Sequence, residues 1–161
     1  MVLEKVAACS SALADNKKKI SFVESASAGR MSYEFSLAEH SGEVLIGGMV
    51  TYDARMKESM LGVPHELIEK YTAESAEVTE SMANQFYKSG QSDICVALTG
   101  LTAPGGSESP KKPVGTIFIH IVFPDKQLAR RFTFDGSPEE IVRQAIEETA
   151  SVITSEIKNQ Q

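Results

Sequence analysis

Apolar residues recur along the chain at two spacings, and each spacing predicts one kind of element. A helical spacing of three or four positions opens the chain, at Val2, Leu3, Val6, Cys9 and Leu13. This set predicts a first helix that ends near the lysines at 17–19. The residues at 94–98 are instead continuously apolar, which is typical of a strand buried on both faces.

Turn and cap signals divide the rest of the chain. The run Ser137-Pro138-Glu139-Glu140 combines an N-cap, a first-turn proline and a capping-box glutamate, and predicts the start of a long final helix. Ser41-Gly42 is expected to break a helix. The other expected helices cover about 30–39, 53–61, 64–71 and 75–88, the strands cover 20–23, 44–52, 94–98, 114–123 and 128–134, and residues 99–113 are expected to be irregular.

This order of elements predicts an α/β fold. Strands that alternate with helices favour a sheet covered on both faces. The three residues 124–126 are too few for a parallel crossover, so the last two strands are expected to form an antiparallel hairpin. We therefore expect residues 1–161 to form a single domain, a three-layer α/β/α sandwich with a mixed, mostly parallel sheet.

Charge and cysteine content narrow the function classes. The net charge is −6, and the longest basic run, at 17–19, is short, so binding to nucleic acid is disfavoured. No apolar stretch is long enough to span a membrane. Cys9 and Cys95 lack metal-ligand or CxxC spacing and are expected to be buried thiols in a reducing compartment. The expected localisation is cytoplasmic and the expected partner is a small molecule.

Three segments with polar chemistry follow predicted strands, where α/β sheets bind ligands. They cover 24–29, 51–57 and 99–106. Ser25 lies on a tight turn whose N–H groups can hold an oxyanion or a phosphate, although from the local residues alone a helix-capping role is the simpler explanation. Lys57 suits a desolvated general base, or a solvated helix lysine.

The remaining candidates have weaker patterns. The three histidines share no ligand spacing, so no metal site is expected. Glu24 can be a general base, although an acidic residue before a turn is common. Arg143, on the final helix, suits either a surface ion pair or phosphate binding. The glycines at 100–106 can wrap N–H groups around an anion, but P-loop spacing is absent.

Taken together, these segments resemble one known family, the CinA C-terminal domain, which also occurs alone as nicotinamide-nucleotide amidase. The similarity covers nearly the whole chain in order and spacing. The blocks that carry it are Glu24-Ser25-Ala26-Ser27-Ala28-Gly29, Gly48 to Tyr52 with Lys57 and Leu61-Gly62-Val63, Gly100 to Gly106, Lys112 to Thr116, and Phe134-Asp135-Gly136 with Arg143-Gln144-Ala145.

The resemblance implies an amidohydrolase that converts nicotinamide mononucleotide and water to nicotinate mononucleotide and ammonia. It implies that Ser25 is the catalytic serine, Lys57 its base and Tyr52 a supporting hydrogen-bonding residue. No metal or organic cofactor is implied, and a homo-oligomer is expected. The implied substrate-binding residues are Ser27, Ala28, Gly29, Thr99, Gly100, Gly105, Gly106 and Arg143.

Two positions depart from the family pattern. Ala28 and Ala103 stand where the family usually has glycine, and alanine is costly wherever the backbone requires a positive φ. Two alternatives to a nicotinamide-nucleotide amidase therefore stay open. One is a non-catalytic nucleotide-binding or interaction domain that retains the fold, and the other is an amidase for a different amide.

Overall fold

The computed structural model describes residues 1–159 and contains a five-stranded mixed sheet in the order β2-β1-β3-β4-β5. β1 is parallel to both of its neighbours, whereas β4 is antiparallel to β3 and to β5. The predicted α/β class, the mixed sheet and the antiparallel hairpin are confirmed. The strands are β1 (Ile20–Glu24), β2 (Leu45–Val50), β3 (Ile94–Gly100), β4 (Thr116–Val122) and β5 (Gln127–Thr133).

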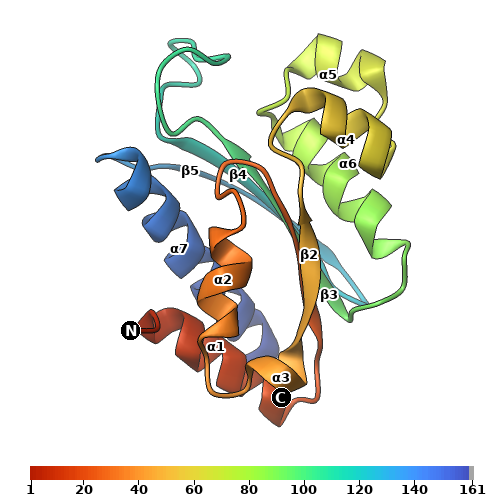
Figure 1. The fold of residues 1–161 in the computed structure, drawn as a ribbon, viewed down its shortest axis with the longest axis vertical. Coiled ribbons are helices and arrows are strands. Elements are labelled where there is room, and N and C mark those ends of the chain that lie inside the picture. The colour runs from red at the N-terminus through yellow and green to blue at the C-terminus, as the bar shows by residue number, and fades with distance from the viewer. Residues whose placement is uncertain (160–161) are drawn as a thin grey trace.

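Helices cover both faces of this sheet (Figure 1). One face carries α1 (Glu4–Asp15), α2 (Arg30–Ser36) and α7 (Pro138–Lys158), and the other carries α4 (Ala54–Leu61), α5 (His65–Tyr71) and α6 (Ala76–Tyr87). The short α3 (Ser41–Val44) leads into β2. The result is the three-layer arrangement that the element order predicts.

Strand alternation divides the apolar residues between two cores. In β1, Phe22 belongs to the core beneath α1 and α7, while its neighbour Val23 belongs to the core beneath α6. Val96 and Ala97 divide in the same way in β3. Because successive side chains point to opposite faces of a strand, a strand between two helical layers buries side chains on both faces, which favours apolar residues at consecutive positions. This explains the continuous apolar run at 94–98.

The helix ends follow their sequence signals. Ser137 accepts a hydrogen bond from the Glu140 N–H, and the Glu140 carboxylate accepts one from the Ser137 N–H, so the predicted capping box is present. Ser75 caps α6 through the Val78 N–H, and Gly62 ends α4 in the left-handed conformation. Each contact satisfies a backbone group that the helix leaves without a partner.

Three expected boundaries were wrong. Residues 41–44 form one helical turn instead of a break, and that turn buries Val44. The second strand ends at Val50, so Thr51 and Tyr52 follow it. The fourth strand begins at Thr116 instead of residue 114, because Gly115 has φ 95° and lies against the Phe134 carbonyl, where a Cβ atom would be 2.0 Å from that oxygen.

Both cysteine thiols are free and buried, as expected. Burial raises the pKa of Cys9 to about 12 and that of Cys95 to about 11. Neither thiol is therefore a ready nucleophile at neutral pH. None of the helices within residues 1–159 combines the length and apolar character needed to cross a bilayer.

Candidate active site

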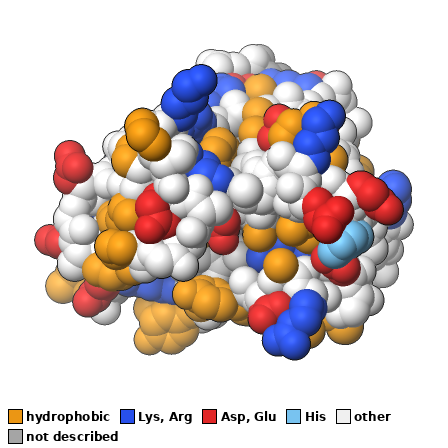
Figure 2. All heavy atoms as spheres, turned by 90° about the horizontal axis from the view of Figure 1, so that it is seen from above, with side chains coloured by type: hydrophobic (Ala, Val, Ile, Leu, Met, Phe, Trp, Pro, Cys, Tyr) orange, Lys and Arg blue, Asp and Glu red, His pale blue; other side chains and the backbone are white. Residues whose placement is uncertain are grey.

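The carboxyl ends of the parallel strands β1, β2 and β3 meet at one edge of the sheet (Figure 1). The chain leaves this edge as three loops, at 25–29, 51–53 and 101–115, and Figure 2 views the molecule from this end. A pocket of about 280 Å³ lies there. Its walls are formed by Ser25, Ala26, Tyr52, Glu74, Gly100, Leu101, Thr102, Ala103, Pro104, Gly105 and Gly106.

Lys57 lies directly behind the pocket serine. Its Nζ atom is 2.9 Å from Ser25 Oγ, 2.6 Å from the Thr51 carbonyl oxygen and 3.3 Å from the Tyr52 carbonyl oxygen. The Lys57 side chain is 1% exposed. Burial lowers its pKa, while the charges of Glu74 and Asp53 act in the opposite direction. A lysine in this position therefore exchanges a proton with Ser25 more readily than a solvated lysine would.

Glu24 holds the turn that carries Ser25. This carboxylate is 1% exposed and accepts five hydrogen bonds from residues 27–32, three from N–H groups and two from hydroxyls. The Ser25 N–H donates to the Leu98 carbonyl, which joins the turn to β3. Glu24 thus organises the backbone around the serine, since each of these five hydrogen bonds to its carboxylate comes from this turn or from α2.

The turn passes through the left-handed region twice. Ala28 has φ 48° and Gly29 has φ 95°, so Ala28 occupies a conformation that is unfavourable for alanine. Among residues 1–159, neither the Ala26 N–H nor the Ser27 N–H donates to a protein acceptor. Two adjacent N–H groups beside a serine hydroxyl are the donors that an oxyanion hole requires.

The structure brings only some of the expected substrate-binding residues to the pocket. Gly100, Gly105 and Gly106 line it. The N–H groups of Gly105 and Gly106 donate to the Glu108 carboxylate, at 2.8 Å each.

The other expected substrate-binding residues are not among those that form its walls. Ser27 is buried and donates to Glu24, and the hydroxyl of Thr99 contacts Thr79 on α6. Arg143 pairs with Glu147 along α7. The side chains at Ala28 and Gly29 cannot supply polar contacts of their own, so any contribution from these two residues is through the backbone.

Tyr52 belongs to the pocket wall and has an exposed side chain. Its side chain is 66% exposed, and within residues 1–159 its hydroxyl has no hydrogen-bond partner. Its backbone carbonyl, however, contacts Lys57. In this structure Tyr52 therefore contributes a free aromatic surface to the pocket, together with a backbone acceptor for the lysine.

Glu74 was not identified from the sequence. It lies in the connection between α5 and α6, lines the pocket, and accepts a 2.5 Å hydrogen bond from Ser107. Lys112, in the loop at 101–115, donates from Nζ to the hydroxyl of Thr72 and to the carbonyl of Glu74. These contacts join the α5–α6 connection to that loop. No local pattern marks Glu74, because only tertiary packing brings the α5–α6 connection to the site.

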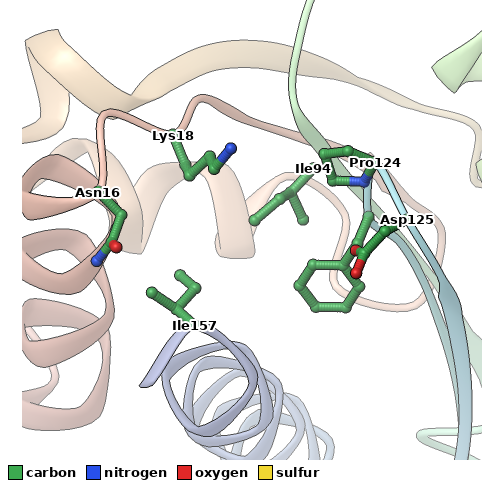
Figure 3. A pocket seen from close by; sticks show the side chains of 7 residues that line it. Asn16, Lys18, Ile94, Pro124, Asp125 and Ile157 are labelled. Carbon is green, nitrogen blue, oxygen red and sulfur yellow. The ribbon is translucent and has the colours of Figure 1, made fainter. Parts of the chain in front are cut away.

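A second pocket, of about 170 Å³, lies at the opposite edge of the sheet (Figure 3). Its lining includes Ile94, Ile157, Lys18 and Asp125, and contains no serine, cysteine or histidine. In the part of the chain that the structure describes, no group of three or more potential metal-ligating side chains occurs. The serine–lysine pocket is the stronger candidate for chemistry.

Comparison with known proteins identifies relatives of this chain. A CinA-like protein from Thermotoga neapolitana is 36% identical over 124 residues, which is 77% of this chain and 30% of the relative. One from Flavobacterium psychrophilum is 29% identical over 145 residues, or 90% of this chain and 34% of the relative. The chain thus spans about a third of the length of these curated relatives.

Solved structures show the same fold. A CinA superfamily protein from Klebsiella pneumoniae superposes with a TM-score of 0.90 at 22% identity, over 97% of each chain. A competence or damage-inducible protein from Enterobacter asburiae gives 0.88 at 24% identity, over 96% of each chain. The profile of the CinA C-terminal domain matches residues 3–157. The chain therefore belongs to the CinA C-terminal domain family.

Proposed function

We propose that this domain hydrolyses the carboxamide of nicotinamide mononucleotide, releasing ammonia and nicotinate mononucleotide. The observation that carries the proposal is the 2.9 Å contact between Lys57 Nζ and Ser25 Oγ at the wall of the pocket. A serine hydroxyl becomes a nucleophile when an adjacent base accepts its proton. A buried lysine with a lowered pKa is such a base.

The three oxygens around Lys57 Nζ match the three N–H groups of an ammonium, and in the neutral amine that the mechanism requires the Ser25 contact is reversed. The carbonyls of Thr51 and Tyr52 accept its two N–H groups, and its lone pair then faces the Ser25 hydroxyl. The amine takes the hydroxyl proton while Ser25 Oγ attacks the carboxamide carbon. The N–H groups of Ala26 and Ser27 stabilise the oxyanion that develops. The lysine ammonium returns the proton to the departing nitrogen, which leaves as ammonia.

An ester between Ser25 and the nicotinoyl group then remains. Water attacks this ester, Lys57 accepts the water proton and returns it to Ser25 Oγ, and the carboxylate product leaves. The sum is one amide and one water converted to one acid and one ammonia. The glycine loop at 100–106 is suited to the ribose phosphate, provided that Glu108 releases the N–H groups of Gly105 and Gly106.

Ammonia release from nicotinamide mononucleotide tests the proposal. Ser25→Ala is expected to lower the rate by about a thousandfold or more, because it removes the nucleophile. Ser59→Ala is the matched control, since Ser59 is an exposed serine on α4, the helix of Lys57. Full activity in Ser25→Ala excludes the serine mechanism. Binding of the nucleotide without turnover favours a binding domain, and turnover of other amides alone favours a different substrate.

A further inference from the structure

Glu74 places a negative charge in the pocket wall. Of the eleven residues that form the pocket, Glu74 is the one from the group of aspartate, glutamate, lysine and arginine. Its Oε2 atom accepts the Ser107 hydroxyl at 2.5 Å. Within residues 1–159, its Oε1 atom accepts no hydrogen bond. One oxygen of this carboxylate is therefore anchored by Ser107, and the other has no protein donor among the described residues.

The nearby lysines do not neutralise this charge by direct contact. Lys112 Nζ lies on three uncharged oxygens, namely the Thr72 hydroxyl at 2.6 Å, the Ser107 hydroxyl at 2.8 Å and the Glu74 carbonyl at 2.8 Å. Lys57 Nζ contacts Ser25 Oγ and two backbone carbonyl oxygens. Among the described residues, neither lysine forms an ion pair with Glu74. Both lysine charges still interact with this carboxylate through space, but neither ammonium contacts it, so the carboxylate can pair with a positively charged ligand.

Tyr52 adds a second feature that favours a cation. It reaches the pocket from the loop after β2, whereas Glu74 comes from the α5–α6 connection. Its exposed ring carries no hydrogen bond through the hydroxyl. The face of a tyrosine ring attracts organic cations, and this attraction is strongest for delocalised charge that is weakly hydrated. The carboxylate and the ring thus offer complementary surfaces to a flat, positively charged heterocycle.

We infer that Glu74 and Tyr52 select a substrate whose amide-bearing ring is a quaternised pyridinium, and discriminate against the neutral ring. The inference rests on the proposed function for the identity of that ring. In nicotinamide mononucleotide the ring nitrogen is bonded to ribose and carries a positive charge. The reduced dihydropyridine form keeps the carboxamide, ribose and phosphate but is neutral, so the two forms isolate the effect of ring charge.

Calorimetric binding of the two forms to the full chain carrying Ser25→Ala tests this inference without turnover. The oxidised form is expected to bind about tenfold more tightly than the reduced form. Glu74→Gln is expected to remove most of that preference by weakening the oxidised form, with little change for the reduced one. Tyr52→Leu should reduce the preference, and Tyr52→Phe should keep it because the ring remains. Glu77→Gln, an exposed carboxylate on α6, is the matched control for loss of one charge.

The outcomes separate this inference from the amidase proposal. A preference that survives Glu74→Gln, or a parent that binds both forms equally, overturns the inference even if the chain with Ser25 intact hydrolyses the amide. A preference that disappears in Glu74→Gln, falls in Tyr52→Leu and persists in Glu77→Gln upholds the inference even if no ammonia is released, in which case the amidase proposal fails alone. Absence of binding by both forms overturns both.

Discussion

Lys57 Nζ lies 2.9 Å from Ser25 Oγ, although 32 positions separate the two residues in the chain. Ser25 follows β1 and Lys57 belongs to α4, which follows β2. Because β1 and β2 are parallel neighbours, the turn after one strand and the helix after the other meet at the same edge. The contact is thus a direct consequence of the parallel pairing.

The rate of amide hydrolysis is expected to rise with pH. The proposed base acts only when neutral, and burial lowers the pKa of Lys57 below its ordinary value of 10.5. The rising limb should therefore have its midpoint below that value. Glu74 opposes this shift, so Glu74→Gln should move the midpoint to still lower pH, and Glu77→Gln should not. Initial rates measured across the neutral and alkaline range provide the check, and a flat profile would contradict lysine as the base.

Glu24→Gln is expected to destabilise the fold by about 2–4 kcal/mol, since a buried acceptor is replaced by an amide donor that faces existing donors. Both carboxylate oxygens of Glu24 already accept hydrogen bonds, three on one and two on the other. Urea unfolding measures the change. Glu77→Gln, on the surface of α6, should stay within about 0.5 kcal/mol of the parent. Equal stability of the two variants would show that Glu24 does not hold the turn.

Ala28→Gly is expected to stabilise the protein by about 0.5–1 kcal/mol, because glycine adopts φ 48° without the steric cost that alanine has. Ala103→Gly is the matched control. Ala103 is also exposed and also stands in a loop of the site, but it is not among the residues with positive φ. Its replacement should give no gain, since glycine only adds entropy to the unfolded chain. Thermal unfolding of both variants measures the change in stability. Stabilisation by Ala103→Gly without stabilisation by Ala28→Gly would contradict the prediction.

Glu108→Ala is expected to speed hydrogen exchange at the N–H groups of Gly105 and Gly106 by about tenfold, because each loses its carboxylate acceptor. The Gly115 N–H is an internal control, since it donates to the Leu101 carbonyl instead. The hydrogen bond from Gly105, with those from the Glu108 and Gly106 N–H groups, lowers the pKa of Glu108. Protonation of Glu108 should therefore release the loop only at a pH below the range in which glutamate usually titrates. Unchanged exchange in the variant would mean that other contacts hold the loop.

Much of the fold could be predicted from local patterns. The apolar run at 94–98 and the capping box at Ser137 mark a buried strand and a helix start without reference to the rest of the chain. The short connection at 124–126 predicts the antiparallel hairpin. The boundaries at 41–44 and 114–116 were wrong because a buried Val44 and a close approach of Gly115 to Phe134 decide them, and both are contacts between distant segments.

The candidate site, like the fold, could be predicted only in part from the sequence. The order of its motifs along the chain identifies the family and points to Ser25, Lys57 and Tyr52. Which atoms meet depends on strand order, helix packing and the path of three loops. The structure turns Ser27 toward Glu24 and Thr99 toward Thr79, and brings Glu74 into the pocket. Sequence spacing specifies local conformation and side-chain chemistry, whereas distances between loops arise only when the sheet and its two helical layers pack together.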